Sequence, residues 1–303
     1  MRITNNMLIN NMMQNLSNNL LRTQKYFNQL ASGKKISLPS DDPIVASKAL
    51  KLRTDVAEIN QYKRNTDDAL AWMDITESTL NQMTELIHRA KELTNQAANG
   101  TNTDEDTLKI REEIAELKHQ LISLGNATYA GRYIFSGYKT DKPLLNDDGT
   151  FNINVENSEQ IKFEIGIGDV ININVPGSDL FNRTTTEATA GSKSEFVDTF
   201  DKIISAMESD DKDMLSSLLG DLDDELNNLL RVRAGLGARV NRVEFTAGRL
   251  EDDNISFTRL MSKNEDVDIA EAIMNLQNEE NVYRASLATG ARVIQPSLID
   301  FLK

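Results

Sequence analysis

The sequence predicts a mainly α-helical protein with a small β insertion. We expect an elongated, nested architecture of antiparallel long helices and coiled coils, with both termini paired. Three observations support this fold class. Apolar residues recur at alternating spacings of three and four along both ends of the chain. Proline is sparse, with five residues in 303, and aromatic residues make up only 6%. Alternation of apolar and polar residues, which is typical of strands, is confined to one central segment.

The N-terminal helix is expected over about residues 5–32, and the last helix over residues 268–302. The N-terminal seam consists of Ile9, Met13, Leu16, Leu20, Thr23, Phe27 and Leu30. The C-terminal seam has the same heptad spacing and consists of Ile269, Ile273, Leu276, Glu280, Tyr283, Leu287, Gly290 and Ile294. Because the seams have similar length, we expect the two helices to pair. Periodicity alone also allows each helix to pack separately on a globular core.

A linker over residues 33–43 is expected to act as a hinge between two helical sections. Gly33 is a natural C-cap, and Ser40, Asp41 and Asp42 can cap the next helix, with Pro43 in its first turn. Two adjacent carboxylates also suggest metal binding, but beside a helix start they are far more typical of capping.

A long helix over residues 44–99 would measure on the order of 80 Å. A turn at residues 99–102 and a return helix over residues 104–128 are expected to follow. The return helix should face inward through Ile110, Ile114, Leu117, Leu121 and Leu124. The only histidines, His88 and His119, lie among charged residues in these helices, so we expect both on solvated faces and predict no metal site.

The pattern changes at Gly131, where an inserted β domain is expected over residues 131–191. Strands are predicted at residues 133–135, 151–155, 161–165 and 170–175. Asp148 and Gly149 form a hairpin signal, and Pro176 with Gly177 should close the last strand. Gly166 and Gly168 are expected in a turn, because a dinucleotide loop would need a third glycine and a following helix. The acids near residue 147 lack the spacing of a calcium loop.

Helices should resume over residues 195–208 and 212–261 after a polar linker at residues 184–194. The second helix is acidic early and basic in the middle, which fits either internal salt bridges or charge matching between subunits. Gly235 and Gly237 weaken this helix, so a close helix approach is expected there. A second linker is expected at residues 262–268. The predicted domains are residues 1–43 with 263–303, residues 44–130 with 192–262, and residues 131–191.

Composition excludes several function classes. The net charge of −14 argues against nucleic acid and against anionic membranes as partners. The chain has no cysteine, and we find no signal peptide and no apolar run long enough to cross a bilayer. No titratable groups converge on a predicted pocket, so we expect a structural protein without cofactor or metal rather than an enzyme. A carbohydrate-active insertion is the alternative from another class, with Glu156, Glu159, Glu164 and Asp169 as candidate paired carboxylates.

Several motifs together resemble the bacterial flagellin superfamily. They are Leu30-Ala-Ser-Gly-Lys-Lys-Ile36, Pro39-Ser-Asp-Asp-Pro43, Glu92-Leu-Thr-Asn-Gln-Ala-Ala-Asn-Gly-Thr101, Gly131-Arg-Tyr-Ile-Phe-Ser-Gly137, Gly237-Ala-Arg239, Asp268-Ile-Ala-Glu-Ala272 and Ser297-Leu-Ile-Asp-Phe-Leu302. The Pro-Ser-Asp-Asp-Pro linker, the Phe-Ser-Gly entry to the insertion and the chain's ending look most like the hook-associated branch, which joins the hook to the filament. Self-polymerising flagellin is the alternative within the superfamily.

The resemblance implies an inner coiled coil of both termini, a helical rod and an outer β domain. It also implies export through the flagellar secretion apparatus without a cleaved signal peptide, to an extracellular place in the flagellum. The implied partners are a ring of copies of itself, a hook-side junction protein, flagellin, and an export chaperone on the C-terminal helix. One departure from the family pattern is Pro296, because proline costs about 3 kcal/mol in a helix interior. We therefore expect the last six residues to bend away or to be capped differently.

Overall fold

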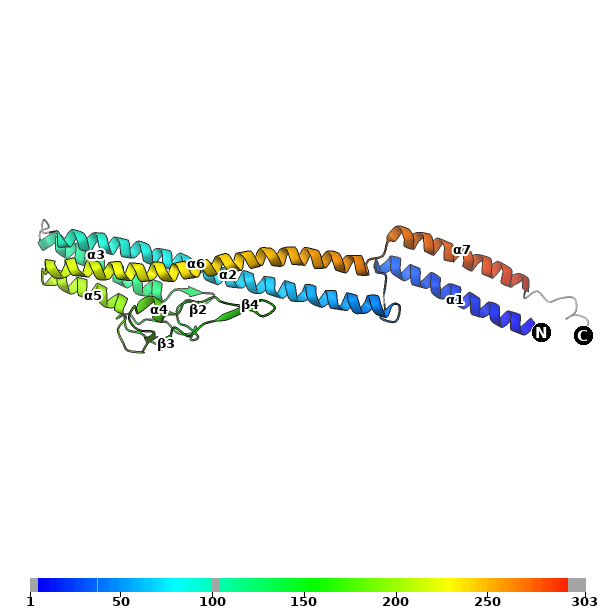
Figure 1. Ribbon diagram of the computed structural model, residues 1–303, viewed down its shortest axis with the longest axis horizontal. Coiled ribbons are helices and arrows are strands. Elements are labelled where there is room, and N and C mark those ends of the chain that lie inside the picture. The colour runs from blue at the N-terminus through cyan, green and yellow to red at the C-terminus, as the bar shows by residue number, and fades with distance from the viewer. Residues whose placement is uncertain (1–4, 37, 100–103, 294–303) are drawn as a thin grey trace, which may run out of the picture. The chain divides into compact units, whose positions relative to one another are not determined.

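The computed structural model describes residues 5–36, 38–99 and 104–293 (Figure 1). Its helices are α1 (Asn5–Ser32), α2 (Pro43–Ala98), α3 (Asp104–Gly125), α4 (Gly177–Phe181), α5 (Glu195–Glu208), α6 (Lys212–Glu265) and α7 (Ile269–Val293). Its strands are β1 (Thr128–Tyr129), β2 (Arg132–Tyr133), β3 (Val155–Glu156), β4 (Lys162–Gly166), β5 (Asp169–Asn172) and β6 (Glu187–Ala188). The predicted class, mainly α-helical with a small β insertion and paired terminal helices, is confirmed.

The chain forms two compact units. Unit 1 contains the residues up to Glu58 together with those from Asp253 onward, and unit 2 runs from Ile59 to Asp252. Each unit includes part of α2 and part of α6. None of the helices that the structure describes is long and apolar enough to cross a membrane.

The core of unit 2 is organised by a wide buried face on α2. One set of buried residues follows the alternating three and four spacing, and a second recurs every seven residues beside it. The first set is Thr66, Ala69, Met73, Thr76, Leu80, Met83, Ile87, Ala90, Thr94 and Ala97, and the second is Trp72, Thr79, Leu86 and Leu93. The threonine hydroxyls do not remain unpaired, because Thr76 and Thr84 each donate to the carbonyl four residues earlier. A face this wide can pack against more than one neighbouring helix.

In unit 2, α2 and α6 run antiparallel and are linked by ion pairs along their length. Lys63 pairs with Glu251, Glu77 pairs with Arg233 at 2.7 Å, and Lys91 pairs with Asp223. The three α2 partners lie fourteen residues apart, which is two heptads. Exposed pairs of this kind contribute little free energy each, so they add little to the stability of unit 2.

The return helix α3 packs against α5 and faces inward as predicted. Ile110, Ile114 and Leu121 are buried, and Leu117 and Leu124 are partly buried against the same core. The return helix was expected to continue to residue 128, but it ends at Gly125. Residues 126–128 are not helical, because Thr128 and Tyr129 pair with β2 in a tight hairpin. Its two turn residues, Ala130 and Gly131, have positive φ, as such turns require.

The segment from residue 128 to residue 188 contains three two-stranded antiparallel sheets, β1-β2, β3-β6 and β4-β5. The predicted turn at Gly168 is confirmed, with a φ of +71° between β4 and β5. The predicted strand at residues 170–175 is paired over its first half, in β5, whereas only Val155 of the predicted strand at residues 151–155 lies in a sheet. Their apolar members Phe151, Ile153, Val155, Ile171, Ile173 and Val175 are nevertheless buried. The alternation of apolar and polar residues therefore predicted correctly which side chains are buried, while backbone pairing is limited to a few residues.

Three other expectations are wrong. The stretch 184–194 is not only a linker, because β6 within it pairs with β3. The second linker is shorter than expected, since α6 remains helical to Glu265. No close helix approach occurs at Gly235 and Gly237, where an added Cβ would meet no atom within 4 Å. The long helix ends at Ala98, within a residue of its predicted end, and residues 100–102 of the predicted turn lie outside the described residues.

Candidate assembly surface

The terminal helices α1 and α7 pack against each other in antiparallel orientation within unit 1. Asn19 Nδ2 donates to Ser286 Oγ at 2.9 Å, and Arg22 Nε donates to Glu279 Oε1 at 3.0 Å. Near the other end, Gly290 lies so close to Met12 that a Cβ there would be 2.7 Å from the methionine sulfur. The contact therefore combines a close glycine approach with polar bonds, and it is not purely apolar.

Only part of the predicted seam lies in this contact. Ile9, Leu16, Thr23, Leu30, Leu276, Glu280 and Tyr283 are half-buried, and Gly290 is buried. Met13, Leu20 and Phe27 on α1 are 55%, 51% and 62% exposed, and Ile269, Ile273 and Leu287 on α7 are also exposed. Ile294 and Pro296 lie outside the described residues. The structure thus places one edge of the predicted seam inside the helix pair and leaves the other edge uncovered.

Sequence reasoning missed several residues of the contact face. They are Met12, Asn19 and Tyr26 on α1 and Ala272, Glu279 and Ser286 on α7. On each helix these residues recur every seven positions. On α1 each lies one residue before a predicted seam residue, namely Met13, Leu20 or Phe27. On α7 each likewise lies one residue before Ile273, Glu280 or Leu287. A heptad repeat at this offset was the available signal, but four of its six members are polar or small, so its apolar pattern is weaker than that of the predicted seam.

The residues Met13, Leu20 and Phe27 form what we call the exposed α1 stripe. Their seven-residue spacing places them on one face of the helix. A groove of about 490 Å³ also lies along the pair, lined by Leu8, Met12, Val282, Ala285 and other residues of α1 and α7. Two helices cannot enclose a core between them, so this pair leaves apolar surface that only further contacts can cover.

The two segments that lead into the terminal helices are joined by a group of contacts, here called the linker clasp. Lys35 N donates to Glu265 O at 2.6 Å, and Val267 N donates to Gly33 O at 3.0 Å. Gly33 has a φ of +69°, a conformation that favours glycine. The segment after α1 is therefore bonded directly to the end of α6, and at this point it is not a free hinge.

A buried carboxylate anchors the linker clasp. Glu265 has a side chain only 2% exposed and accepts two bonds from Arg53, at 2.6 and 2.7 Å, in a bidentate pair. Lys34 Nζ lies 3.2 Å from Glu265 and 2.8 Å from Asp266. The bonds from Arg53 and then from Lys34 hold the pKa of Glu265 below its usual value, against the effect of burial.

The long helix begins at Pro43, within a residue of the predicted start, and of the two acids before it Asp42 has the predicted capping role. Asp42 Oδ1 accepts from Ile44 N at 3.0 Å and from Val45 N at 3.1 Å, so Asp42 is the N-cap. Asp41 accepts from Leu38 N and shapes the preceding turn. Among the described residues no group of three or more histidine and acidic side chains could hold a metal ion.

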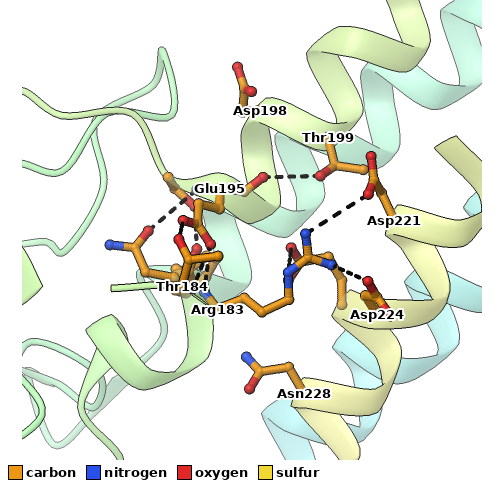
Figure 2. A network of polar contacts seen from close by, with 12 residues as sticks. Arg183, Thr184, Glu195, Asp198, Thr199, Asp221, Asp224 and Asn228 are labelled. Carbon is orange, nitrogen blue, oxygen red and sulfur yellow. Dashed lines mark hydrogen bonds and ion pairs between the residues drawn. The ribbon is translucent and has the colours of Figure 1, made fainter. Parts of the chain in front are cut away.

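In unit 2 an arginine of the insertion enters an acidic cluster (Figure 2). Arg183 pairs with Asp224 at 2.9 Å and lies 3.9 Å from both Asp221 and Glu225. Its backbone N–H and that of Thr184 both donate to Glu195 Oε2, at 2.7 and 3.0 Å. This network ties the segment after α4 to the starts of α5 and α6.

The candidate catalytic carboxylates each have local partners or lie alone on the surface. Glu159 accepts from the backbone N–H of Tyr138, and Glu156 accepts from Ser158. Asp169 pairs with Arg242 on α6, and Glu164 is exposed. These contacts are those of surface acids that shape turns or join the insertion to α6.

Two family models match most of the chain. The model for the bacterial flagellin N-terminal helical region matches residues 3–140, and the model for the bacterial flagellin C-terminal helical region matches residues 219–302. The chain is 32% identical to flagellar hook-associated protein 3 of Escherichia coli (strain K12), over 94% of this chain and 95% of the relative. It is 26% identical to a flagellin of Bacillus subtilis (strain 168), over 97% of each chain.

Solved structures show the same fold. A putative flagellar hook-associated protein from Vibrio parahaemolyticus superposes with a TM-score of 0.65 at 22% identity, covering 75% of this chain and all of that one. FlgL of Bacillus cereus superposes with a TM-score of 0.59 at 23% identity, covering 70% of this chain and 99% of that one.

Proposed function

This chain belongs to the bacterial flagellin family, and we propose that it is a structural hook-associated protein that connects the hook to the filament. The observation that carries this choice is the likeness over nearly the whole length to hook-associated protein 3, at 32% identity. The flagellin of Bacillus subtilis matches over a similar length at 26%. The Pro-Ser-Asp-Asp-Pro linker and the Phe-Ser-Gly entry to the insertion favour the same branch.

The exposed apolar residues of the α1–α7 pair support the view that this chain acts by assembling with other protein subunits. We propose that neighbouring copies in a ring cover the exposed α1 stripe, and that the predicted seam residues of α1 and α7 form the inner coiled coil. The proposed domains are the terminal coiled coil (residues 1–43 and 263–303), a helical rod (residues 44–130 and 192–262) and the outer β domain (residues 131–191). We assign no catalytic step to the chain.

Deleting the gene in a motile strain tests the junction role. We expect hooks without filaments, with flagellin lost to the medium, and recovery when the gene is supplied again. Normal filaments in the deletion strain would rule the junction role out.

Flagellin, the self-polymerising filament subunit, is the alternative, because relatives of that kind also match the whole chain. The purified protein mixed with filament seeds separates the two. A junction protein should not extend the seeds, whereas long filaments in electron micrographs would identify a flagellin.

Further partners follow from the junction role. They are a hook-side junction protein, flagellin on the far side, and an export chaperone that holds the C-terminal helix before secretion. We propose export through the flagellar apparatus without a cleaved signal. Neither nucleic acid nor membrane is a proposed partner, in keeping with the net charge of −14. Co-purification of a small cytoplasmic protein with the full chain, lost when α7 is removed, tests the chaperone.

A further inference from the structure

Glu225 occupies a position in the α6 sequence that its neighbours fill with apolar residues. The buried stripe of α6 runs through Leu215, Leu218, Leu222, Glu225, Leu229, Val232 and Leu236, again at spacings of three and four. The side chain of Glu225 is only 1% exposed, and neither carboxylate oxygen has a hydrogen-bond partner among the described residues. Buried polar groups are ordinarily paired, so this carboxyl group is unusual.

The nearest cation does not neutralise this group fully. Arg183 Nε is 3.9 Å from Glu225 Oε1, which is beyond hydrogen-bond distance, while the same guanidinium binds Asp224 at 2.9 Å. Figure 2 shows Arg183 directed toward Asp221 and Asp224 on α6. An ionised Glu225 would therefore be a buried charge with only a shared partner, which is costly.

The other charged groups near Glu225 are mostly acidic or already paired. Glu195 at the start of α5 and Asp221 and Asp224 on α6 all disfavour a further negative charge. Lys202 on α5 interacts with Asp221 of this cluster, but it pairs directly with Asp198.

Burial and these carboxylates together raise the pKa of Glu225 to about 7, against the opposing effect of Arg183. The usual pKa of a glutamate, 4.5, is taken for Glu225 in the unfolded chain. The folded chain therefore binds a proton between pH 4.5 and 7 that the unfolded chain releases. Stability from this group is fully present below pH 4.5 and is lost as the pH rises through 7.

We propose that Glu225 is a proton-binding site that controls how firmly α6 holds α5 and the Arg183–Thr184 segment of the insertion. With its proton, Glu225 is a neutral member of the apolar stripe, and unit 2 is most stable. Without it, a charge lies in the core, and the contact weakens. If the chain is exported as proposed above, unit 2 folds more firmly in an acidified medium than at neutral pH. The proton site itself does not depend on that role.

Chemical denaturation of the full chain across pH 5 to 8 tests the site. Trp72, the only tryptophan, lies in the core of unit 2 and reports its unfolding by fluorescence. A shift from 4.5 to about 7 corresponds to a change of roughly 300-fold in the folding equilibrium constant. Most of this change should fall between pH 5 and 8 in the wild-type chain. Glu225→Gln should remove that change and should be the more stable chain at pH 8.

Glu244→Gln is the matched control, because Glu244 is an exposed acid on the same helix. It should retain the wild-type pH dependence. A Glu225→Gln chain with the same pH dependence as wild type would overturn the proposal.

Should Glu225→Gln not fold, the wild-type chain supplies an independent test. The carboxyl carbon of Glu225 can be followed by nuclear magnetic resonance during a pH titration. A midpoint near 7 supports the site, and a midpoint near 4.5 overturns it.

Discussion

Replacing Met13, Leu20 and Phe27 together by glutamine would remove the exposed α1 stripe and leave the contact face with α7 unchanged. Glutamine has a helix propensity close to that of methionine and leucine, so α1 should still form. These side chains are 55%, 51% and 62% exposed. Full burial of such a side chain contributes about 1.5–3 kcal/mol, so covering the exposed half contributes about 1 kcal/mol each.

The three substitutions should therefore weaken assembly by about 3 kcal/mol per copy, which is roughly a hundredfold in affinity. The free chain should change little, because each replaced group is on the surface. The assay is the amount of the chain in isolated flagella relative to the medium, in a deletion strain supplied with the variant. Circular dichroism of the purified chain checks that its helices remain.

A matched control changes Asn10, Ser17 and Gln24 to other polar residues, since these also lie seven apart on exposed positions of α1. This control should incorporate normally. If the stripe variant also incorporates at the wild-type level, neighbouring copies do not cover the stripe, and the assembly argument fails.

Three further results are expected. Gly177→Ala should destabilise unit 2 by about 1–3 kcal/mol, because the new Cβ would collide with Leu144. Gly237→Ala should stabilise unit 2 by about 1 kcal/mol, because alanine has a higher helix propensity and the added Cβ meets no atom. Chemical denaturation followed by tryptophan fluorescence measures both changes. Arg53→Gln should speed amide exchange in the linker clasp, since it leaves the buried Glu265 with Lys34 as its only ion-pair partner among the described residues. Unchanged exchange would contradict this. Amides of α1 and α7 should exchange faster than those of the unit 2 core in the free chain and slow down on assembly; equal protection in a demonstrated monomer would mean that the terminal pair is self-sufficient.

The helices were predictable because their signals are local. Periodicity and caps predicted α5 at residues 195–208, as observed, and placed the start of α2 within a residue of Pro43. Strand pairing was less predictable, because β3 pairs with β6 across a long loop that contains α4. Alternation shows which side chains are buried, but it does not show which backbone groups meet.

The candidate site was predictable only in outline. The heptad pattern identified the correct two helices, but it placed every second seam position of α1 one residue too far along the helix, because the buried Asn19 is polar and does not follow an apolar pattern. Arg53 and Glu265 are 212 residues apart, so no local pattern could pair them. Glu225 did leave a signal, since it interrupts a leucine stripe at the three and four spacing, but the neighbouring acids Asp223 and Asp224 made it look like part of a solvated run.

The contrast between the two units explains why order at the termini should depend on neighbours. Unit 2 encloses many fully buried side chains, whereas the pair α1–α7 buries only Asn19, Ala272 and Gly290 among its described residues. Ordering each residue costs about 1–2 kcal/mol, and half-buried side chains offset less of that cost than buried ones do. Any surface that binds the ordered pair and not the disordered one shifts the equilibrium by mass action. The ring of copies proposed above would supply that surface at high local concentration. The terminal pair can therefore remain weakly ordered in the free chain and become stable where the exposed α1 stripe is covered.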